Sequence, residues 1–404
     1  MSSQSSIPVS RPVPPPPPDW QRDEDPPRRK NYWPLKVAAI LVVLLLLFSI
    51  LFFTPVGKDF MASLTGNSYA ESSEFTVNRE ITIDISSGEI SWICDIPVPE
   101  TISSPSGAIQ SMESSDPDPK IDPIEKYGWE WIEWSGTDNS LVTLTMTYQA
   151  AVRTVIWDIT PEESGMVSDI PADLLERQGG NEWEVVEGNG IPTGEFKIWP
   201  EHSEINELSE SLTSPELTVV ENTRNIYDYI RENVDYQTVS GSEPKSCLET
   251  LEDGTGDCDD QSILLISLLR AAGIPSWLAF GVLYDGGNDA WGAHAWAEVY
   301  MPLADGNGGS VVIDVVNSEF LVRNCNRLEE WKSDGIGDHL SDYYHILSYN
   351  YTLANPHQLP PSVDISDDYT GDYEGSASKV YVALPSVGNP EGSVRGILAS
   401  RKVF

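Results

Sequence analysis

The chain has few basic residues for its size. Its 404 residues include 24 Lys and Arg against 63 Asp and Glu, which gives a formal net charge of −39. Residues 1–56 hold six basic and four acidic side chains, so the acidic excess lies entirely in the remainder. A surface of this sign repels phosphate groups, and we expect no nucleic-acid partner. It also stays hydrated at high salt, which predicts that salt stabilises the chain.

Cysteine is also scarce. The four cysteines lie at positions 94, 247, 258 and 325 and form no C-x-x-C pair. This spacing gives no support for a zinc site, and we expect neither a metal nor another cofactor. One disulfide together with free thiols is compatible with the count, and the sequence leaves the pairing of Cys94, Cys247 and Cys325 open.

Long uncharged apolar runs are absent except for one near the N-terminus. Residues 37–53 form 17 positions without a charge, and the run extends to residue 56. This is just long enough for a helix that crosses a bilayer. Five basic residues at positions 22–36 precede the run and only Lys58 follows closely, which places the N-terminus in the cytoplasm. We expect a single-pass membrane anchor at 37–56; a cleaved signal peptide is the alternative.

Composition divides the rest of the chain into segments. Residues 1–36 are rich in Ser and Pro and should form a disordered cytoplasmic tail. Residues 57–160 alternate apolar with polar positions, which predicts a β-rich domain next to the membrane. A loop-rich linker follows at 161–200, then an α+β domain at 201–350, where helical and strand patterns alternate. Residues 351–404 are polar and should form a weakly structured C-terminal extension.

The stretch Gly254-Thr-Gly-Asp-Cys258 indicates a reactive cysteine. Helix-forming, mostly apolar residues follow it and end at Gly273-Ile-Pro275, which predicts a buried helix over 258–272. Cys258 would lie at its N-terminus, where unpaired N–H groups and the helix dipole favour thiolate over thiol. A buried structural cysteine is the ordinary alternative.

Two β-rich runs downstream carry a partner for this cysteine. Residues 293–301 and 310–316 flank a Gly-rich turn, as in an antiparallel hairpin. His294 and Asp314 are equally distant from residue 304 in that turn, so they should face each other. A carboxylate among Val and Ile needs a hydrogen bond, and an imidazole can supply one. Asp314 would then orient His294, which would accept the proton of Cys258.

Each of these residues also has an ordinary explanation. His294 alone could be a core histidine, and Asp314 alone a strand-end carboxylate. Occurring together in this order with Cys258, they favour an active site with catalytic residues Cys258, His294 and Asp314. The backbone N–H of Cys258 is a candidate oxyanion donor, and residues 236–237 are a candidate source of a second one.

These motifs resemble the transglutaminase-like superfamily, especially its prokaryotic and archaeal members. The resemblance covers about 235–320 and rests on Gly-Asp-Cys258, on Arg270-Ala-Ala-Gly-Ile-Pro275, on His294-Ala-Trp-Ala-Glu-Val-Tyr300 and on Asp314. It implies a papain-like α+β fold at 201–350, with a Cys-bearing buried helix on an antiparallel sheet and a Cys-His-Asp triad.

Two features depart from this pattern. Many relatives have Pro-Thr after the aspartate, whereas Val315-Val-Asn317 follows here. Three acids at 257, 259 and 260 also surround the cysteine in sequence, and a negative charge there opposes thiolate formation. We interpret these acids as helix caps or as side chains that point outward.

The resemblance implies thiolate attack on an amide carbonyl and a thioacyl intermediate. With water as acceptor the protein would be a protease or amidase, and this is our first expectation. With a lysine amine as acceptor it would cross-link proteins, and a non-catalytic surface binding or scaffold module is a third possibility. The expected substrate is a protein or peptide at the cell surface; the sequence does not predict the oligomeric state.

Overall fold

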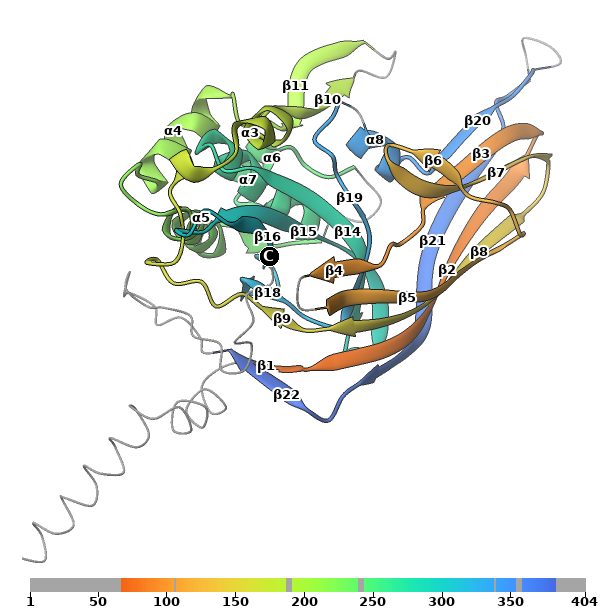
Figure 1. Ribbon diagram of the computed structural model, residues 1–404. Helices are drawn as coiled ribbons and strands as arrows, with labels where there is room; N and C mark the ends of the chain where they lie inside the picture. Colours follow the sequence, from red (N-terminus) through yellow and green to blue (C-terminus); the bar gives the residue numbers. More distant parts are fainter. Residues whose placement is uncertain are drawn as a thin grey trace, which may run out of the picture. The chain divides into compact units, whose positions relative to one another are not determined.

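The computed structural model in Figure 1 describes residues 67–104, 107–186, 191–238, 243–337, 339–353 and 358–382. These ranges all belong to one compact unit that begins at Pro55. Among the helices described there, none has the length and apolar character needed to cross a bilayer. The tail expected at 1–36 and the anchor expected at 37–56 lie outside the described residues.

A sandwich of two antiparallel sheets is built from both ends of the described chain. The first sheet has the strand order β21-β2-β8-β5-β4 and the second β20-β3-β7-β6. In β2 burial alternates almost without interruption, because every second side chain of a strand points to the same face. The first sheet comprises β2 (Ser72–Ser87), β4 (Ile102–Ser104), β5 (Gly107–Asp118), β8 (Val142–Arg153) and β21 (Ser362–Gly375). The second comprises β3 (Ile90–Pro97), β6 (Ile124–Lys126), β7 (Trp129–Asp138) and β20 (Leu347–Asn350).

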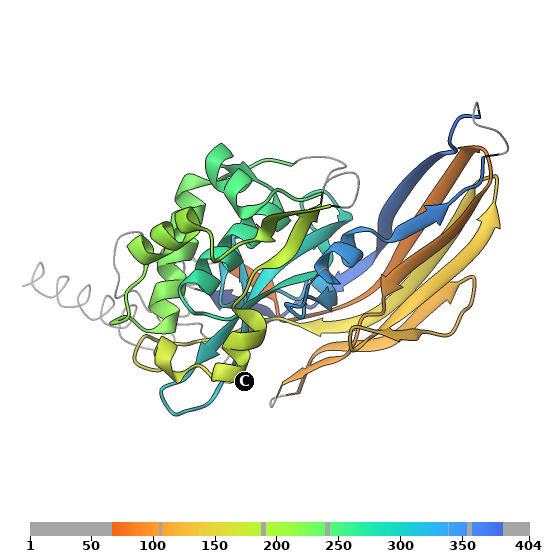
Figure 2. The same ribbon diagram turned by 90° about the horizontal axis from the view of Figure 1, so that it is seen from above.

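The C-terminal strands correct one expectation. The segment predicted to be weakly structured contains β21, which pairs with β2 along nearly its whole length. The orange β2 and the blue β21 therefore lie side by side in Figures 1 and 2. The sequence signal was misleading because β21 is an exposed edge strand rich in Asp, a residue that strands ordinarily avoid.

A separate five-stranded sheet, called the central sheet below, has the order β17-β16-β15-β14-β19. Its hairpin strands confirm the predicted β-runs around the Gly-rich turn. The strands are β14 (Ser276–Asp285), β15 (Ala290–Pro302), β16 (Gly308–Asp314), β17 (Glu319–Phe320) and β19 (Arg327–Lys332).

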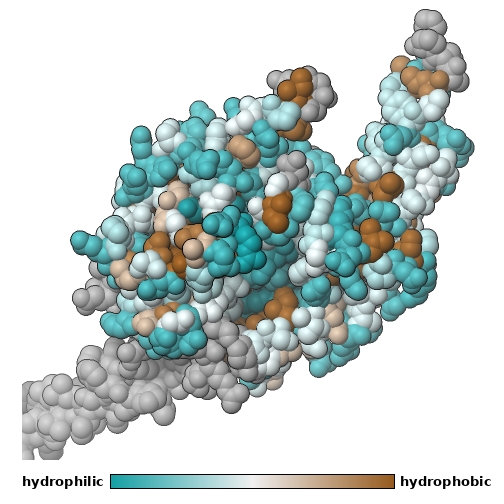
Figure 3. Space-filling view, turned by 45° about the horizontal axis from the view of Figure 1, so that its top comes forward, coloured by the Kyte–Doolittle hydropathy of each residue, from teal (hydrophilic) through white to brown (hydrophobic). Residues whose placement is uncertain are grey.

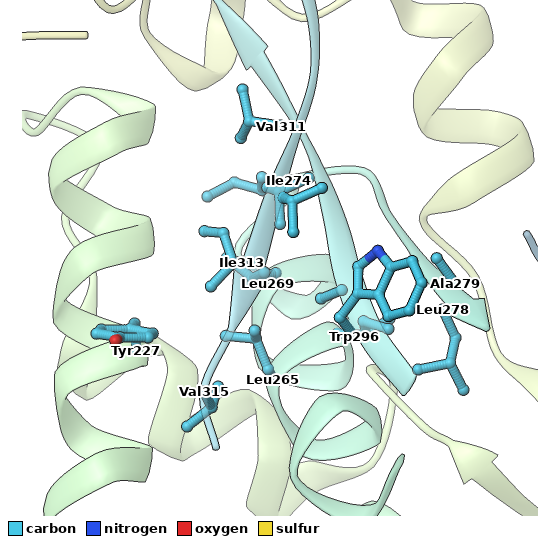
Figure 4. Packing of buried hydrophobic residues seen from close by; sticks show 14 of the residues in the cluster. Tyr227, Leu265, Leu269, Ile274, Leu278, Ala279, Trp296, Val311, Ile313 and Val315 are labelled. Atoms are coloured by element: carbon cyan, nitrogen blue, oxygen red, sulfur yellow. The ribbon is translucent and has the colours of Figure 1, made fainter. Parts of the chain in front are cut away.

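The predicted buried helix is confirmed as α7 (Cys258–Ala271), in which every residue from 260 to 270 is buried. Leu265 and Leu269 point toward Ile313 and Ile274 in Figure 4, and α7 packs mainly against β15 and β14. Three further helices contact α7, namely α4 (Ser203–Leu212), α5 (Val219–Asn233) and α6 (Cys247–Asp253). An α+β fold with a cysteine-bearing helix on an antiparallel sheet is thus confirmed.

The segment predicted as a linker at 161–200 is part of this core. Glu182 in β10 forms a buried ion pair with Arg270 of α7, at 2.8 Å, and Trp183 and Ile198 belong to the same apolar cluster as α7. The remaining elements are the 3-10 helix Val167–Asp169, α3 (Ala172–Gln178), α8 (His339–Tyr344), β1 (Asn67–Ala70) paired with β22 (Lys379–Val382), β9 (Val155–Ile156) with β18 (Val322–Arg323), β10 (Glu182–Val186) with β11 (Pro192–Ile198), and β12 (Asp235–Tyr236) in parallel with β13 (Thr255–Gly256).

All four cysteines are free thiols, and Cys94, Cys247 and Cys325 are buried. The sandwich and the central sheet share apolar contacts, since Phe75 of β2 lies 5.0 Å from Trp291 of β15, measured between ring centroids. The face shown in Figure 3 is mainly hydrophilic, with small separate hydrophobic patches.

The acidic excess creates like-charge pairs on the outer face of the sandwich. Glu74 lies opposite Glu374, Glu80 opposite Asp368 and Asp84 opposite Asp364 in the β2–β21 register. All six residues are exposed. Like charges directly opposite each other destabilise a strand pair, and salt screens such repulsion.

We expect salt to stabilise the fold and Asp368→Lys to relieve one of these repulsions. Lys at 368 would face Glu80, which should raise the free energy of unfolding at low salt by about 0.5–1 kcal/mol, with Asp368→Asn giving a smaller gain. The gain should shrink in 1 M NaCl. Urea unfolding of the three proteins at both salt concentrations measures it, and destabilisation of the wild type by 1 M NaCl would contradict the interpretation.

Candidate active site

Cys258 is the first residue of α7, as the sequence predicts. Asp257 caps the helix and forms a capping box with Asp260. The carboxylate of Asp260 is buried and accepts the backbone N–H of Lys245 at 2.6 Å. Two of the three acids thus satisfy N–H groups around the helix start, in agreement with the interpretation of the acids as caps.

The third acid, Asp259, does not point away into solvent. Its Oδ2 accepts the hydroxyl of Tyr344, the last residue of α8, at 2.7 Å. Tyr344 has its pKa raised well above the ordinary value, first by burial and then by the charge of Asp259. This tyrosine fixes a carboxylate beside the sulfur, and no sequence pattern pointed to it.

The surroundings of the Cys258 sulfur favour the thiol over the thiolate. Burial, followed by the negative charge of Asp259, raises the pKa of Cys258 well above its ordinary value. A hydrogen bond from the backbone N–H of Ala295 acts in the opposite direction but is outweighed. The helix terminus alone therefore does not activate this sulfur, and a thiolate here needs a cation beside it.

The contact with Ala295 brings Cys258 to the strand position next to His294. The paired register of β15 and β16 reaches Ala297 opposite Ile313 and stops there. Ala295 lies beyond this pairing, so its N–H can be directed at the sulfur. The helix and the strand therefore bring the cysteine and the histidine to the same place in the fold.

His294 and Asp314 are in direct contact, as predicted. The distance between His294 Nε2 and Asp314 Oδ2 is 2.8 Å. The predicted register is wrong by two residues, because the hairpin centres on residue 305 and Asp314 falls beside Trp296. Both side chains still lie on one face, since a shift of two residues preserves the strand's alternation.

Asp314 is a strong anion in spite of its burial. Burial alone raises the pKa of its carboxyl, but the ring of His294 and the guanidinium of Arg327 outweigh this and hold the pKa well below its usual range. Arg327 lies 3.0 Å from Asp314 Oδ2. The carboxylate can accept a hydrogen bond from Nε2–H, which leaves Nδ1 of the neutral ring free to take a proton from a thiol.

Asn317, three residues after Asp314, completes the contacts of this carboxylate. Its backbone N–H donates to Asp314 Oδ1 at 3.1 Å and its side-chain Nδ2 to Oδ2 at 2.8 Å. Nδ2 also lies 3.1 Å from His294 Nε2. The departure at Val315-Val-Asn317 therefore adds a side-chain donor to Asp314 next to the histidine.

Arg327 lies between two buried carboxylates. One is Asp314, and the other is Glu319, with which Arg327 forms a very close ion pair. Asp314 has further partners in His294 and Asn317, whereas burial and the negative charge of Asp314 raise the pKa of Glu319 to about 7. Sequence reasoning missed Arg327 and Glu319, because charged residues in short strands carry no pattern that shows their burial.

The candidate oxyanion donors lie near the sulfur. Cys258 is the first residue of a helix, so its N–H has no intrahelical acceptor. Burial, followed by the electrostatic effect of the Cys258 sulfur, raises the pKa of Tyr236. The tyrosine therefore lies close enough to the sulfur to interact with it. The backbone N–H of Gln237 is already donated to Gly256 at 3.1 Å. The second donor would therefore be the N–H of Tyr236, which points the other way along the strand.

The ligand atoms of Asp257, Cys258 and Asp259 lie within 4.8 Å of one another. They are consecutive residues at one helix start, where Asp257 caps the helix and Asp259 accepts Tyr344. This grouping follows from their order in the chain and does not by itself define a metal site.

Comparison with known proteins agrees with this geometry. Residues 206–314 match the family model described as the transglutaminase-like superfamily, and this part of the chain is a domain of that superfamily. The matched segment contains Cys258, His294 and Asp314. No curated protein sequence gave a significant match.

A solved structure shares the fold over most of the chain. It is described as a candidate cysteine protease from Cytophaga hutchinsonii, is 15% identical, and has a TM-score of 0.53, with 82% of this chain and 99% of that chain covered. The periplasmic domain of TgpA from Pseudomonas aeruginosa (14% identity, TM-score 0.30, 63% and 90% covered) and a candidate protease from Parabacteroides distasonis (14%, 0.23, 64% and 68%) are more distant.

The raised pKa of Glu319 predicts how stability depends on pH. An acid whose pKa is raised on folding stabilises the fold below its unfolded pKa and loses that contribution as the pH rises through the folded value. Between the ordinary 4.5 and about 7, wild type should lose stability relative to Glu319→Gln. From pH 5 to pH 7 the difference should change by about 2 kcal/mol. Urea unfolding at the two pH values measures it, and a constant difference would refute the assignment.

Proposed function

We propose that the chain is a cysteine enzyme that acts on peptide or amide bonds through a thioacyl intermediate, with water as the usual acceptor. The observation that carries the proposal is the bond between His294 Nε2 and Asp314 Oδ2, on the strand whose next residue donates its N–H to the Cys258 sulfur. This arrangement leaves Nδ1 of His294 as the base for the thiol. The superfamily match over the same residues supports it.

The steps follow from these positions. The proton of Cys258 passes to His294, and the thiolate forms a bond to the carbonyl carbon. When the C–N bond breaks, the amine leaves with the proton from His294, and a thioester remains. Water then attacks the thioester, His294 takes its proton, and the acid is released as the thiol is restored. An amine in place of water would give acyl transfer, which is the alternative reaction.

The roles of the three residues differ. Cys258 is the nucleophile and His294 the acid and base. Asp314 orients the ring and stabilises the imidazolium. Asn317 and Arg327 are positioning residues, because they act on the ring or on Asp314. The N–H groups of Cys258 and Tyr236 are the donors we assign to the oxyanion.

We further propose that residues 37–56 anchor the chain in the membrane, with the enzyme outside the cytoplasm. The uncharged run and the excess of basic residues before it support this. A C-terminal epitope tag on intact cells should be accessible to added protease. Protection of the tag until the cells are lysed would contradict this orientation.

A thioacyl adduct on Cys258 tests the proposed chemistry. The full chain, incubated with a mixed peptide library and quenched in acid, should carry a peptide mass on the Cys258 fragment, and neutral hydroxylamine should remove it. Cys258→Ala should stay folded and show no adduct. Adding a lysine-rich peptide separates the two acceptors, because transfer gives a joined product and hydrolysis gives a free acid.

Turnover of the library in Cys258→Ala would contradict the proposal. An adduct confined to other cysteines in the wild type would do so as well.

A further inference from the structure

A cavity of about 560 Å³ opens beside His294 and Asn317. Tyr236, the neighbour of the Cys258 sulfur, lines one part, and the turn that joins β14 to β15 lines another. Gly286, Gly292 and Ala293 supply little side-chain bulk. His294, the candidate catalytic histidine, lines this cavity, so a group bound in the cavity would be part of the substrate. The inference below therefore rests on the function proposed above.

The fixed charge along the cavity is negative. Among the described residues that line it, Asp285 is the carboxylate and there is no Lys or Arg. Asp285 is fixed in place, since Oδ1 accepts the N–H of Gly287 at 2.8 Å and Oδ2 accepts the amide of Asn288 at 2.6 Å. These two bonds, that of Gly287 first, lower its pKa, so the anion persists to low pH.

Aromatic side chains form much of the rest of the wall. Tyr236, Tyr284 and Trp291 line the cavity. Tyr284 donates its hydroxyl to a second carboxylate, Asp289, at 2.6 Å, and its ring stacks on Tyr373 at 4.3 Å between centroids. Aromatic faces next to a carboxylate are the chemistry that binds an organic cation, and the acidic chain attracts such a group from solution.

We propose that this cavity selects a basic side chain, Lys or Arg, of the peptide substrate. Asp285 is paired with Ala290 in the hairpin, four residues from His294. Four strand residues span about 13 Å. A long basic side chain one or two positions from the reacting amide can cover that distance, with its charged end at Asp285 and its stem along the aromatic wall.

Binding of model peptides to the Cys258→Ala full chain tests this without requiring any turnover. Three capped pentapeptides of alanine would differ only at the second position, which holds Arg, Gln or Glu, and isothermal titration calorimetry would give their dissociation constants. We expect the Arg peptide to bind at least about tenfold more tightly than the Glu peptide, an amount typical of one well-placed charge contact.

Matched variants separate the cavity from the general acidity of the chain. In the same background, Asp285→Asn should reduce the preference for Arg several-fold, and Asp285→Lys should reverse it. Glu210→Gln removes the same charge from an exposed position of α4 outside the cavity and should leave the preference unchanged. Circular dichroism confirms that each variant is folded.

Equal binding of the three peptides, or no binding of any, would overturn the proposal. A preference for Arg that survives Asp285→Asn would also overturn it, because the whole-chain field would then be the cause. A missing thioacyl adduct together with Arg-selective, Asp285-dependent binding would instead remove the proposed reaction and leave the cavity as a site for basic peptides.

Discussion

A buried thiol among carboxylates is the constraint on which the account of this site depends. Cys258 begins a helix, yet burial and Asp259 raise its pKa above that of an ordinary thiol. A thiolate can form only together with a positive charge close to it, and on this strand His294 can supply that charge. The cysteine, the histidine and the carboxylate that holds the histidine therefore act as one unit.

The fold fixes this unit through buried polar contacts around Asp314. Its carboxylate is contacted by His294, Asn317 and Arg327. Arg327 also forms an ion pair with Glu319. Such a buried network requires all of its partners, because removing one leaves a charge without compensation. The sandwich contributes from the side, since Phe75 of β2 packs on Trp291 of β15. The strands outside the superfamily match thus support the segment that carries the candidate site.

Local sequence signals predicted the central elements well. The apolar run after Cys258 and its Gly-Ile-Pro end predicted α7. The alternation of side chains along a strand placed His294 and Asp314 on one face, even though the predicted register was two residues off. Pairing between distant segments was not predictable, because nothing in the Asp-rich sequence of β21 indicates that it joins β2. The same limit explains why Arg327, Glu319 and Tyr344 were missed. Their importance comes from burial beside residues that lie far away in the chain.

The rate at which iodoacetamide alkylates Cys258, measured against pH, tests the central claim most directly. The full chain, His294→Ala and Asp314→Asn would be compared, with peptide mass spectrometry to separate Cys258 from the other three cysteines. A thiolate–imidazolium pair predicts fast alkylation that persists below about pH 7 and is lost in His294→Ala, with Asp314→Asn between the two. Slow alkylation that rises only above about pH 8.5 in all three proteins would show an unactivated thiol and contradict the account.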